Sequence, residues 1–248
     1  MVHGWQERRT SFGSVAADYA ALRPGYPAAA VPFLLGTAPR RVLDLGAGTG
    51  LLTERVLAAG HEVVAVDLSA PMLDQLRSRL PQVAAAVGGA EAVPLPDGNV
   101  DAVVAGQAAH WFDVVPTAAE LRRVLRPGGV VGLVWNTRDE RVPWVHALGE
   151  LLADEARDHE ADQTVVDRFA AELPAEVEVL DSAVTQLVAP DQVVSGIGTR
   201  SYVATMDQAR RGEFLGRVHD LLATHPDTRG RAELELPYTT RAYRLTPS

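Results

Sequence analysis

The sequence has 248 residues, 47% of them hydrophobic, a net charge of −9, and neither cysteine nor lysine. These features exclude disulfides, thiolate metal sites, cysteine nucleophiles and lysine Schiff-base chemistry, and the acidic balance without a basic stripe argues against nucleic acid as a partner. No apolar run approaches the ~20 residues of a membrane span and no signal-peptide core is visible, so we expect a cytoplasmic, arginine-rich bacterial protein with no membrane partner, as a monomer or homodimer.

The first 37 residues are predicted to form a leader. Apolar residues recur at the spacing of one helix face from Phe12 to Tyr19, and Pro24 and Pro27 limit that helix. Two interpretations stay open: the helix covers one end of the core, or Tyr19 and Arg23 close over a bound ligand.

Between residues 38 and 136 apolar strands alternate with helices. The expected strands are Val42–Leu45, Glu62–Asp67, Val83–Val87, Val100–Ala105 and Val130–Trp135. The expected helices are 51–57, 69–80 and 118–125, the last of which is ended by 126–129. This alternation is typical of a parallel sheet that is covered on both faces.

The part from residue 137 to 248 is less regular. A helix is expected at 145–159, a strand at 176–188, helical structure at 191–225 and a closing strand at 231–245. We therefore predict a single α/β domain. It has a doubly wound, mostly parallel seven-stranded sheet with helices on both faces, an antiparallel last strand, and a helical cap inserted at about 190–226 over the substrate.

The glycine-rich turn from Gly46 to Gly50 predicts the ligand. Strand, glycine turn and helix together suit a nucleotide-like ligand, but Leu51 stands where a dinucleotide-binding fingerprint has its third glycine. Asp44, two residues before the turn, is a poor neighbour for a pyrophosphate and a good one for a cation. Asp67, at the end of the second strand, suits a ribose diol. S-adenosylmethionine carries adenosine, an ammonium and a sulfonium, and fits this combination.

A series of motifs in order extends this interpretation. The segments are Phe12-Gly with Tyr19 and Arg23–Tyr26, Val42–Gly50, Val66–Ser69 with Met72, Ala90-Glu91 with Pro94–Pro96, Val100–Gln107, and Leu125–Gly129. In this order they resemble the class I S-adenosylmethionine-dependent methyltransferases, closest to the small-molecule group with the ubiquinone/menaquinone-type core. The resemblance covers about residues 12 to 135.

The resemblance implies a role for each matching position. Gly46 and Gly48 would line the methionine part of the cofactor, with Asp44 near its ammonium and Gln107 near its carboxylate. The remaining implied contacts are Asp67 on the ribose, Leu68 and Met72 on the adenine face, Ala90 and Glu91 at the adenine edge, and Tyr19 and Arg23 closing the site. Many relatives have an aspartate where this chain has Gly89, and Glu91 is the candidate to replace it; the alternative is a solvated Glu91.

The segment Gln107–Asp113 follows the fourth strand and carries the candidate acceptor chemistry. His110 has a suitable pKa for a general base, or else shapes the loop through a backbone contact, and Trp111 is a candidate substrate wall. A carboxylate acceptor would need an arginine instead of a base. The candidates are Arg23, Arg138, Arg200 and Arg241.

We therefore expect methyl transfer from S-adenosylmethionine to a small organic acceptor with a carboxylate, hydroxyl or ring carbon as nucleophile. The rival hypotheses are a non-catalytic cofactor-binding or partner protein with the same fold and an NAD(P)-dependent oxidoreductase. No metal site is expected, because the seven histidines show no ligand-type pairing.

Overall fold

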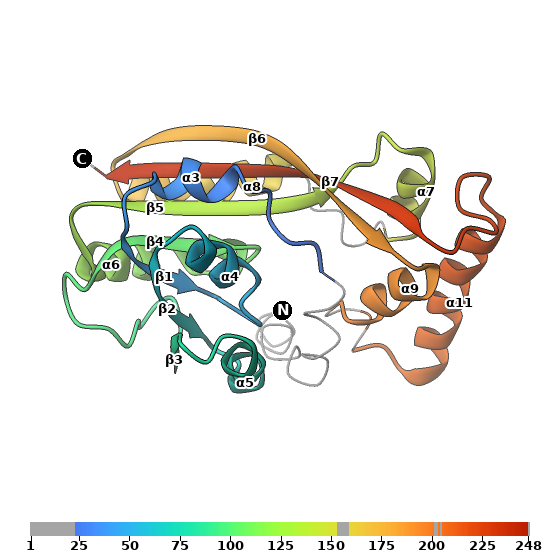
Figure 1. Ribbon diagram of the computed structural model, residues 1–248, viewed down its shortest axis with the longest axis horizontal. Helices are drawn as coiled ribbons and strands as arrows, with labels where there is room; N and C mark the ends of the chain where they lie inside the picture. Colours follow the sequence, from blue (N-terminus) through green and yellow to red (C-terminus); the bar gives the residue numbers. More distant parts are fainter. Residues whose placement is uncertain (1–22, 153–158, 201–202, 204, 248) are drawn as a thin grey trace.

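A seven-stranded sheet runs through the computed structural model, which describes residues 23–152, 159–200, 203 and 205–247 (Figure 1). Its strand order is β3-β2-β1-β4-β5-β7-β6. The strands are β1 (Arg41–Leu45), β2 (Glu62–Asp67), β3 (Ala84–Val87), β4 (Val100–Gly106), β5 (Leu125–Arg138), β6 (Ala175–Val188) and β7 (Leu234–Pro247). Only β7 is antiparallel to its neighbours, β5 and β6, among the pairs of described strands. The predicted seven-stranded, mostly parallel sheet with an antiparallel last strand is confirmed.

Helices cover both faces of the sheet. On one face lie α3 (Ala30–Leu35), α4 (Leu51–Ala58) and α5 (Ala70–Arg79), and on the other α6 (Val114–Val124) and α8 (His159–Glu172). In Figure 1, α3 lies in front of β5 and β7 and α8 behind them. Residues 129–135 of β5 are buried without interruption, because a central strand receives helices on both sides and needs no polar face.

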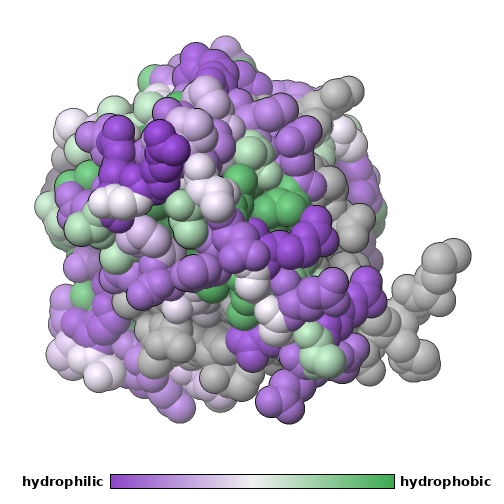
Figure 2. All heavy atoms as spheres, turned by 90° about the vertical axis from the view of Figure 1, so that its right-hand side faces the viewer, coloured by the Kyte–Doolittle hydropathy of each residue, from purple (hydrophilic) through white to green (hydrophobic). Residues whose placement is uncertain are grey.

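The cap forms a separate apolar cluster at the carboxyl edge of the parallel strands. It consists of α7 (Pro143–Leu151), α9 (Pro190–Gly198), α11 (Gln208–Thr224) and the adjoining ends of β6 and β7. Because β6 points the same way as β5, its last residue delivers α9 directly to this edge. Figure 2 shows the cap side of the molecule as mostly hydrophilic, with a small group of apolar residues near its middle.

Several predicted boundaries were wrong. A strand was expected to begin at Val130, but β5 begins at Leu125: its register with β4 shifts between Val100 and Ala102, so that the segment 126–129 bulges within the strand. The helix expected at 145–159 ends at Leu151, and α8, with buried Val166 and Phe169, is a second helix that the acidic composition obscured.

The helical stretch expected at 191–225 is divided into α9 and α11. The second helix has its own start signal, since the Asp207 side chain accepts a hydrogen bond from the Arg210 amide at 2.9 Å. The helix expected from Phe12 to Tyr19 lies outside the described residues. No described helix is long and apolar enough to cross a lipid bilayer.

Candidate active site

The glycine turn lies between β1 and α4, where the strand order reverses between β1 and β4. Gly46, Gly48 and Gly50 have φ angles of 74°, 55° and 87°, a region that favours glycine. A Cβ on Gly46 would lie 2.6 Å from the Cβ of Ala108, which follows β4, whereas a Cβ on Gly48 would meet no described residue within 4 Å. The turn is therefore packed at Gly46 and borders a space that no described residue fills at Gly48, in the crevice where open α/β sheets bind ligands.

Asp44 is buried beneath this turn, with 1% of its surface exposed. The Thr53 hydroxyl, from α4, donates to Asp44 Oδ2 at 2.5 Å, and Oδ1 has no hydrogen-bond partner among the described residues. Burial raises the pKa of Asp44 to about 7; the Thr53 hydrogen bond opposes the rise and the Asp67 carboxylate adds to it. A buried carboxylate with one vacant oxygen is well suited to a cationic ligand.

Asp67 ends β2 and faces the same turn. Its two oxygens accept hydrogen bonds from the backbone amides of Gly48 and Ser69, each at 2.8 Å. Burial raises the pKa of Asp67, while these amides oppose the rise. Because a carboxylate offers about four acceptor positions, Asp67 retains capacity for the hydroxyls of a ligand after binding both amides.

The positions implied for adenine contact lie together next to Asp67. Leu68 is 44% exposed, whereas Met72 and Ala90 are buried. A Cβ on Gly89 would lie 3.5 Å from Leu68 Cδ2. A half-exposed leucine over a glycine leaves an apolar surface of the kind that a planar base covers.

Glu91 lies at the edge of this surface and connects it to α6. Its Oε1 accepts a hydrogen bond from the Asp113 amide at 3.1 Å, and its Oε2 would be 3.0 Å from a Cβ on Gly89. A side chain at position 89 would therefore require the Glu91 carboxylate to shift by a few tenths of an ångström.

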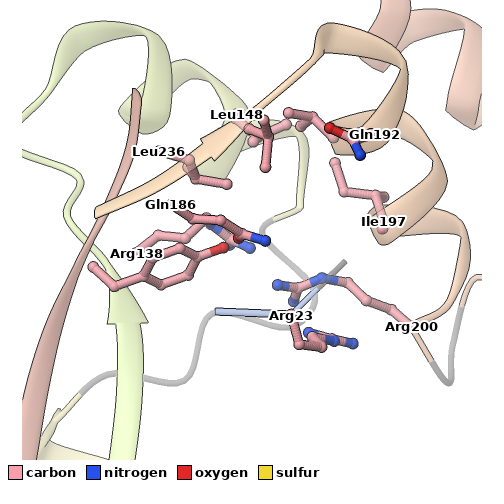
Figure 3. Close-up of a pocket in the computed structure, with 12 residues that line it drawn as sticks. Arg23, Arg138, Leu148, Gln186, Gln192, Ile197, Arg200 and Leu236 are labelled. Atoms are coloured by element: carbon pink, nitrogen blue, oxygen red, sulfur yellow. The ribbon is translucent and has the colours of Figure 1, made fainter. Parts of the chain in front are cut away.

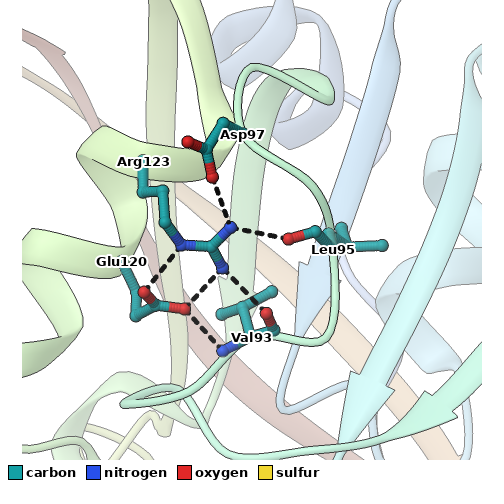
Figure 4. A network of polar contacts seen from close by, with 5 residues as sticks. All are labelled: Val93, Leu95, Asp97, Glu120 and Arg123. Carbon is teal, nitrogen blue, oxygen red and sulfur yellow. Dashed lines mark hydrogen bonds and ion pairs between the residues drawn. The ribbon is translucent and has the colours of Figure 1, made fainter.

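The segment that follows Glu91 is fixed by the network in Figure 4. Arg123 donates to the carbonyl oxygens of Val93 and Leu95 and to Asp97, and it pairs with Glu120 through two nitrogens. Glu120 in turn accepts from the Val93 amide at 2.7 Å. These bonds hold the loop against α6, and with it the edge of the site.

Gln107 joins the glycine turn to β5. It is the one non-glycine residue with positive φ (56°) among the described residues, and its side chain donates to the Asn136 carbonyl oxygen at 2.6 Å. The Asn136 side chain donates to the Gly25 carbonyl oxygen at 3.0 Å. A residue whose strained backbone is fixed by its hydrogen-bonded neighbours is typical of functional sites.

His110 lies in the short helix η2 (Ala109–Trp111). The indole of Trp135, which is 1% exposed, donates its N–H to His110 Nδ1 at 3.2 Å. This bond requires Nδ1 to be unprotonated, so the neutral ring carries its proton on Nε2. Trp111 is half-buried, with its ring centroid 5.0 Å from that of His110.

Three of the four candidate arginines line one pocket that is partly open to solvent, shown in Figure 3. Arg23, Arg138 and Arg200 each act to lower the pKa of the Tyr238 hydroxyl, although burial has the larger effect and raises it. The other lining residues are Leu148, Gln186, Val188, Gln192, Val193, Gly196, Ile197 and Leu236.

The fourth candidate, Arg241, is elsewhere: it forms a two-bond ion pair with Asp181 on β6, at 2.6 and 3.0 Å. Tyr238 and Gln186 were missed by sequence reasoning, because only the pairing of β6 with β7 brings them to the pocket. Tyr19 lies outside the described residues. Among the residues that the structure describes, no group of three or more histidine or acidic side chains is arranged to hold a metal ion.

Comparisons with known proteins agree with this arrangement. Residues 43–133 match the family model "Methyltransferase domain". The chain is 45% identical over 236 residues to an uncharacterised methyltransferase of Mycobacterium tuberculosis, which covers 95% of each chain. It is 31% identical to an uncharacterised methyltransferase-like protein of Schizosaccharomyces pombe over 94% of each.

A solved structure from Anaeromyxobacter dehalogenans, provisionally assigned as a type II methyltransferase, superposes with a TM-score of 0.65 at 30% identity over 91% of this chain and 97% of that one. The matched family model includes the glycine turn and ends within β5, and the relatives extend the match through the cap. The chain therefore belongs to the class I S-adenosylmethionine-dependent methyltransferases.

Proposed function

We propose that this methyltransferase binds S-adenosylmethionine over the glycine turn and transfers its methyl group to a small organic acceptor held beneath the cap. The observation that carries the proposal is the two carboxylates at the glycine turn, the buried Asp44 and the partly buried Asp67, next to a space at Gly48 that no described residue fills. The vacant oxygen of Asp44 suits the cofactor ammonium, and Asp67 suits the ribose hydroxyls.

The remaining cofactor contacts follow from the neighbouring surfaces. Leu68 and Met72 pack on the adenine, with Ala90 and Glu91 at its edge, and Gln107 lies toward the methionine carboxylate. The cofactor supplies the electrophilic methyl group. The protein aligns the acceptor with that group and excludes water, which is the main contribution a protein makes to such a displacement. Helices α9 and α11 form the roof of the acceptor site.

His110 serves this site as a hydrogen-bond partner and not as a general base. A base must have a vacant nitrogen, and Trp135 occupies Nδ1 while the proton sits on Nε2. This arrangement favours an acceptor that needs no deprotonation, namely a carboxylate, over a hydroxyl.

We expect His110→Ala to lower the free energy of unfolding by about 1–3 kcal/mol, because the buried Trp135 N–H loses its acceptor. His110→Asn, whose Oδ1 can replace Nδ1, should recover most of this loss in urea unfolding. The Asn variant should also keep turnover within a few-fold of the parent. A hundredfold loss together with the disappearance of the acidic limb of the pH–rate profile would instead identify His110 as a base.

The cofactor assignment is tested by calorimetry with S-adenosylhomocysteine. We expect Asp67→Asn, which replaces an acceptor oxygen by a donor, to weaken binding by about 10- to 100-fold, or roughly 1–3 kcal/mol. The matched control is Asp74→Asn on the exposed side of α5, which should leave the affinity unchanged. Equal affinity of the two variants would refute the ribose contact. NADH binding by the parent in the absence of S-adenosylhomocysteine binding would refute the proposed function.

A further inference from the structure

The pocket under the cap concentrates positive charge from distant parts of the chain. Arg23 precedes the first described helix, Arg138 ends β5, and Arg200 follows α9, yet all three line one cavity with Tyr238 (Figure 3). Every charged side chain in the described lining is an arginine. Guanidinium groups present paired donors in a geometry that matches a carboxylate.

Two of the three arginines are close in sequence to residues that connect the pocket to the glycine turn. Gly46 packs against Ala108, and the preceding residue, Gln107, bonds to Asn136, which in turn bonds to Gly25. Arg138 is two residues beyond Asn136, and Arg23 is two residues before Gly25. Two of the three cations are therefore linked through adjacent residues to the turn over which the cofactor is proposed to bind.

The rest of the pocket is mainly apolar. Leu148, Val193, Ile197 and Leu236 line it and belong to the apolar cluster of the cap. In Figure 3, Leu148 and Ile197 lie away from Arg23 and Arg200. The cavity thus has a cationic part and an aliphatic part.

We infer that the methyl acceptor is a monocarboxylic acid with a short aliphatic body, whose carboxylate binds to Arg23, Arg138 and Arg200 and whose body lies against the cap. The inference rests on the proposed function and specifies its substrate class. Buried Gln186 Oε1, which has no partner among the described residues, offers an acceptor for one hydroxyl or amide on that body.

The reaction then needs no proton transfer. A carboxylate oxygen forms a bond to the methyl carbon while the bond from that carbon to the sulfonium sulfur breaks, and the electron pair of the broken bond remains on sulfur. Both the negative carboxylate and the positive sulfonium become neutral, which gives a methyl ester and S-adenosylhomocysteine. The methyl ester is neutral and no longer forms ion pairs with the arginines, so the residues that bind the substrate bind the product weakly.

The test measures acid binding and turnover in the full chain with a series of straight-chain acids from butanoate to decanoate. Binding is followed by calorimetry with S-adenosylhomocysteine present, and the methyl ester by mass spectrometry with S-adenosylmethionine. We expect affinity to increase with chain length until the apolar part is filled. Hexanamide, the neutral counterpart of hexanoate, should bind at least tenfold more weakly.

Arg138→Gln and Arg200→Gln should each weaken acid binding at least tenfold and leave S-adenosylhomocysteine affinity within twofold of the parent. Arg138→Lys should recover part of the loss, which a folding defect would not allow. Arg217→Gln, at an exposed position of the cap helix α11, is the matched control and should change neither affinity.

Hexanamide binding as tightly as hexanoate, or unchanged acid binding in both glutamine variants, would overturn the inference. Stronger binding of hexyl phosphate with no ester formed from any acid would show an anion site and overturn the carboxylate acceptor. In each of these cases the parent still binds S-adenosylhomocysteine. Failure of that binding would refute the proposed function itself.

Discussion

Replacing Gly46 by alanine is expected to abolish cofactor binding and to destabilise the protein. The new Cβ would lie 2.6 Å from Ala108 Cβ, and these two backbones cannot separate without moving β1 from β4. Position 46 also has φ of 74°, which costs an L-residue roughly 1–2 kcal/mol. Strain and overlap together should lower the free energy of unfolding by about 2–4 kcal/mol.

Two other glycines separate these effects. Gly60, which follows α4, has φ of 89° and Gly48 has φ of 55°, and a Cβ on either would meet no described residue within 4 Å. Gly60→Ala should therefore show the strain alone, with S-adenosylhomocysteine affinity unchanged. Gly48→Ala should be destabilised to a similar extent but lose cofactor binding at least tenfold, because its Cβ enters the space proposed for the ligand. Thermal unfolding and calorimetry on the three variants measure both quantities.

If Gly48→Ala bound S-adenosylhomocysteine as tightly as Gly60→Ala, the space beside Gly48 would not be the cofactor site. If Gly46→Ala were no less stable than Gly60→Ala, the close packing on Ala108 would not matter to the fold.

The parallel strands and the cofactor half of the site follow from local sequence. Buried parallel strands have nearly continuous apolar runs, and glycine turns and strand-end acids come at fixed distances from them, so Asp44, Gly46 and Asp67 could be named from short segments. Thr53 could have been added, since it lies in the first turn of α4 immediately after the glycine turn.

The acceptor half depends on contacts between distant segments and could not be predicted in the same way. Arg138 and Arg241 were equivalent candidates in the sequence, but Asp181 pairs with Arg241 only because β6 lies beside β7. The same pairing places Tyr238 in the pocket. The choice of tautomer at His110 likewise depends on Trp135, which is 25 residues away.

The second large effect concerns pH and Asp44. Because burial raises the pKa of this carboxyl from 3.8 to about 7, the folded protein holds a proton that the unfolded chain has lost between these two values. Without ligand, the Asp44 contribution to stability is therefore greatest near pH 4 and falls as the pH rises through about 7. The loss of stability between these two pKa values corresponds to about 4 kcal/mol. Asp44→Asn should regain this stability at pH 8 and not at pH 4.

Cofactor binding should show the opposite trend. The ammonium of S-adenosylhomocysteine favours the ionised carboxylate, so binding must remove the proton from Asp44 wherever the free protein holds it. The dissociation constant should fall about tenfold per pH unit up to pH 7 and then level off. Calorimetry in buffers of different ionisation enthalpy should detect the release of close to one proton at pH 6 and close to none at pH 8.

Asp44→Asn separates this effect from the titration of Asp67, the partly buried carboxyl at the site. The variant should bind S-adenosylhomocysteine at least tenfold more weakly at pH 8 and show little dependence of its affinity on pH, because its amide neither ionises nor pairs with a cation. A variant that kept the pH dependence of the parent would assign the proton to Asp67. In that case the vacant oxygen of Asp44 would not be the contact of the ammonium.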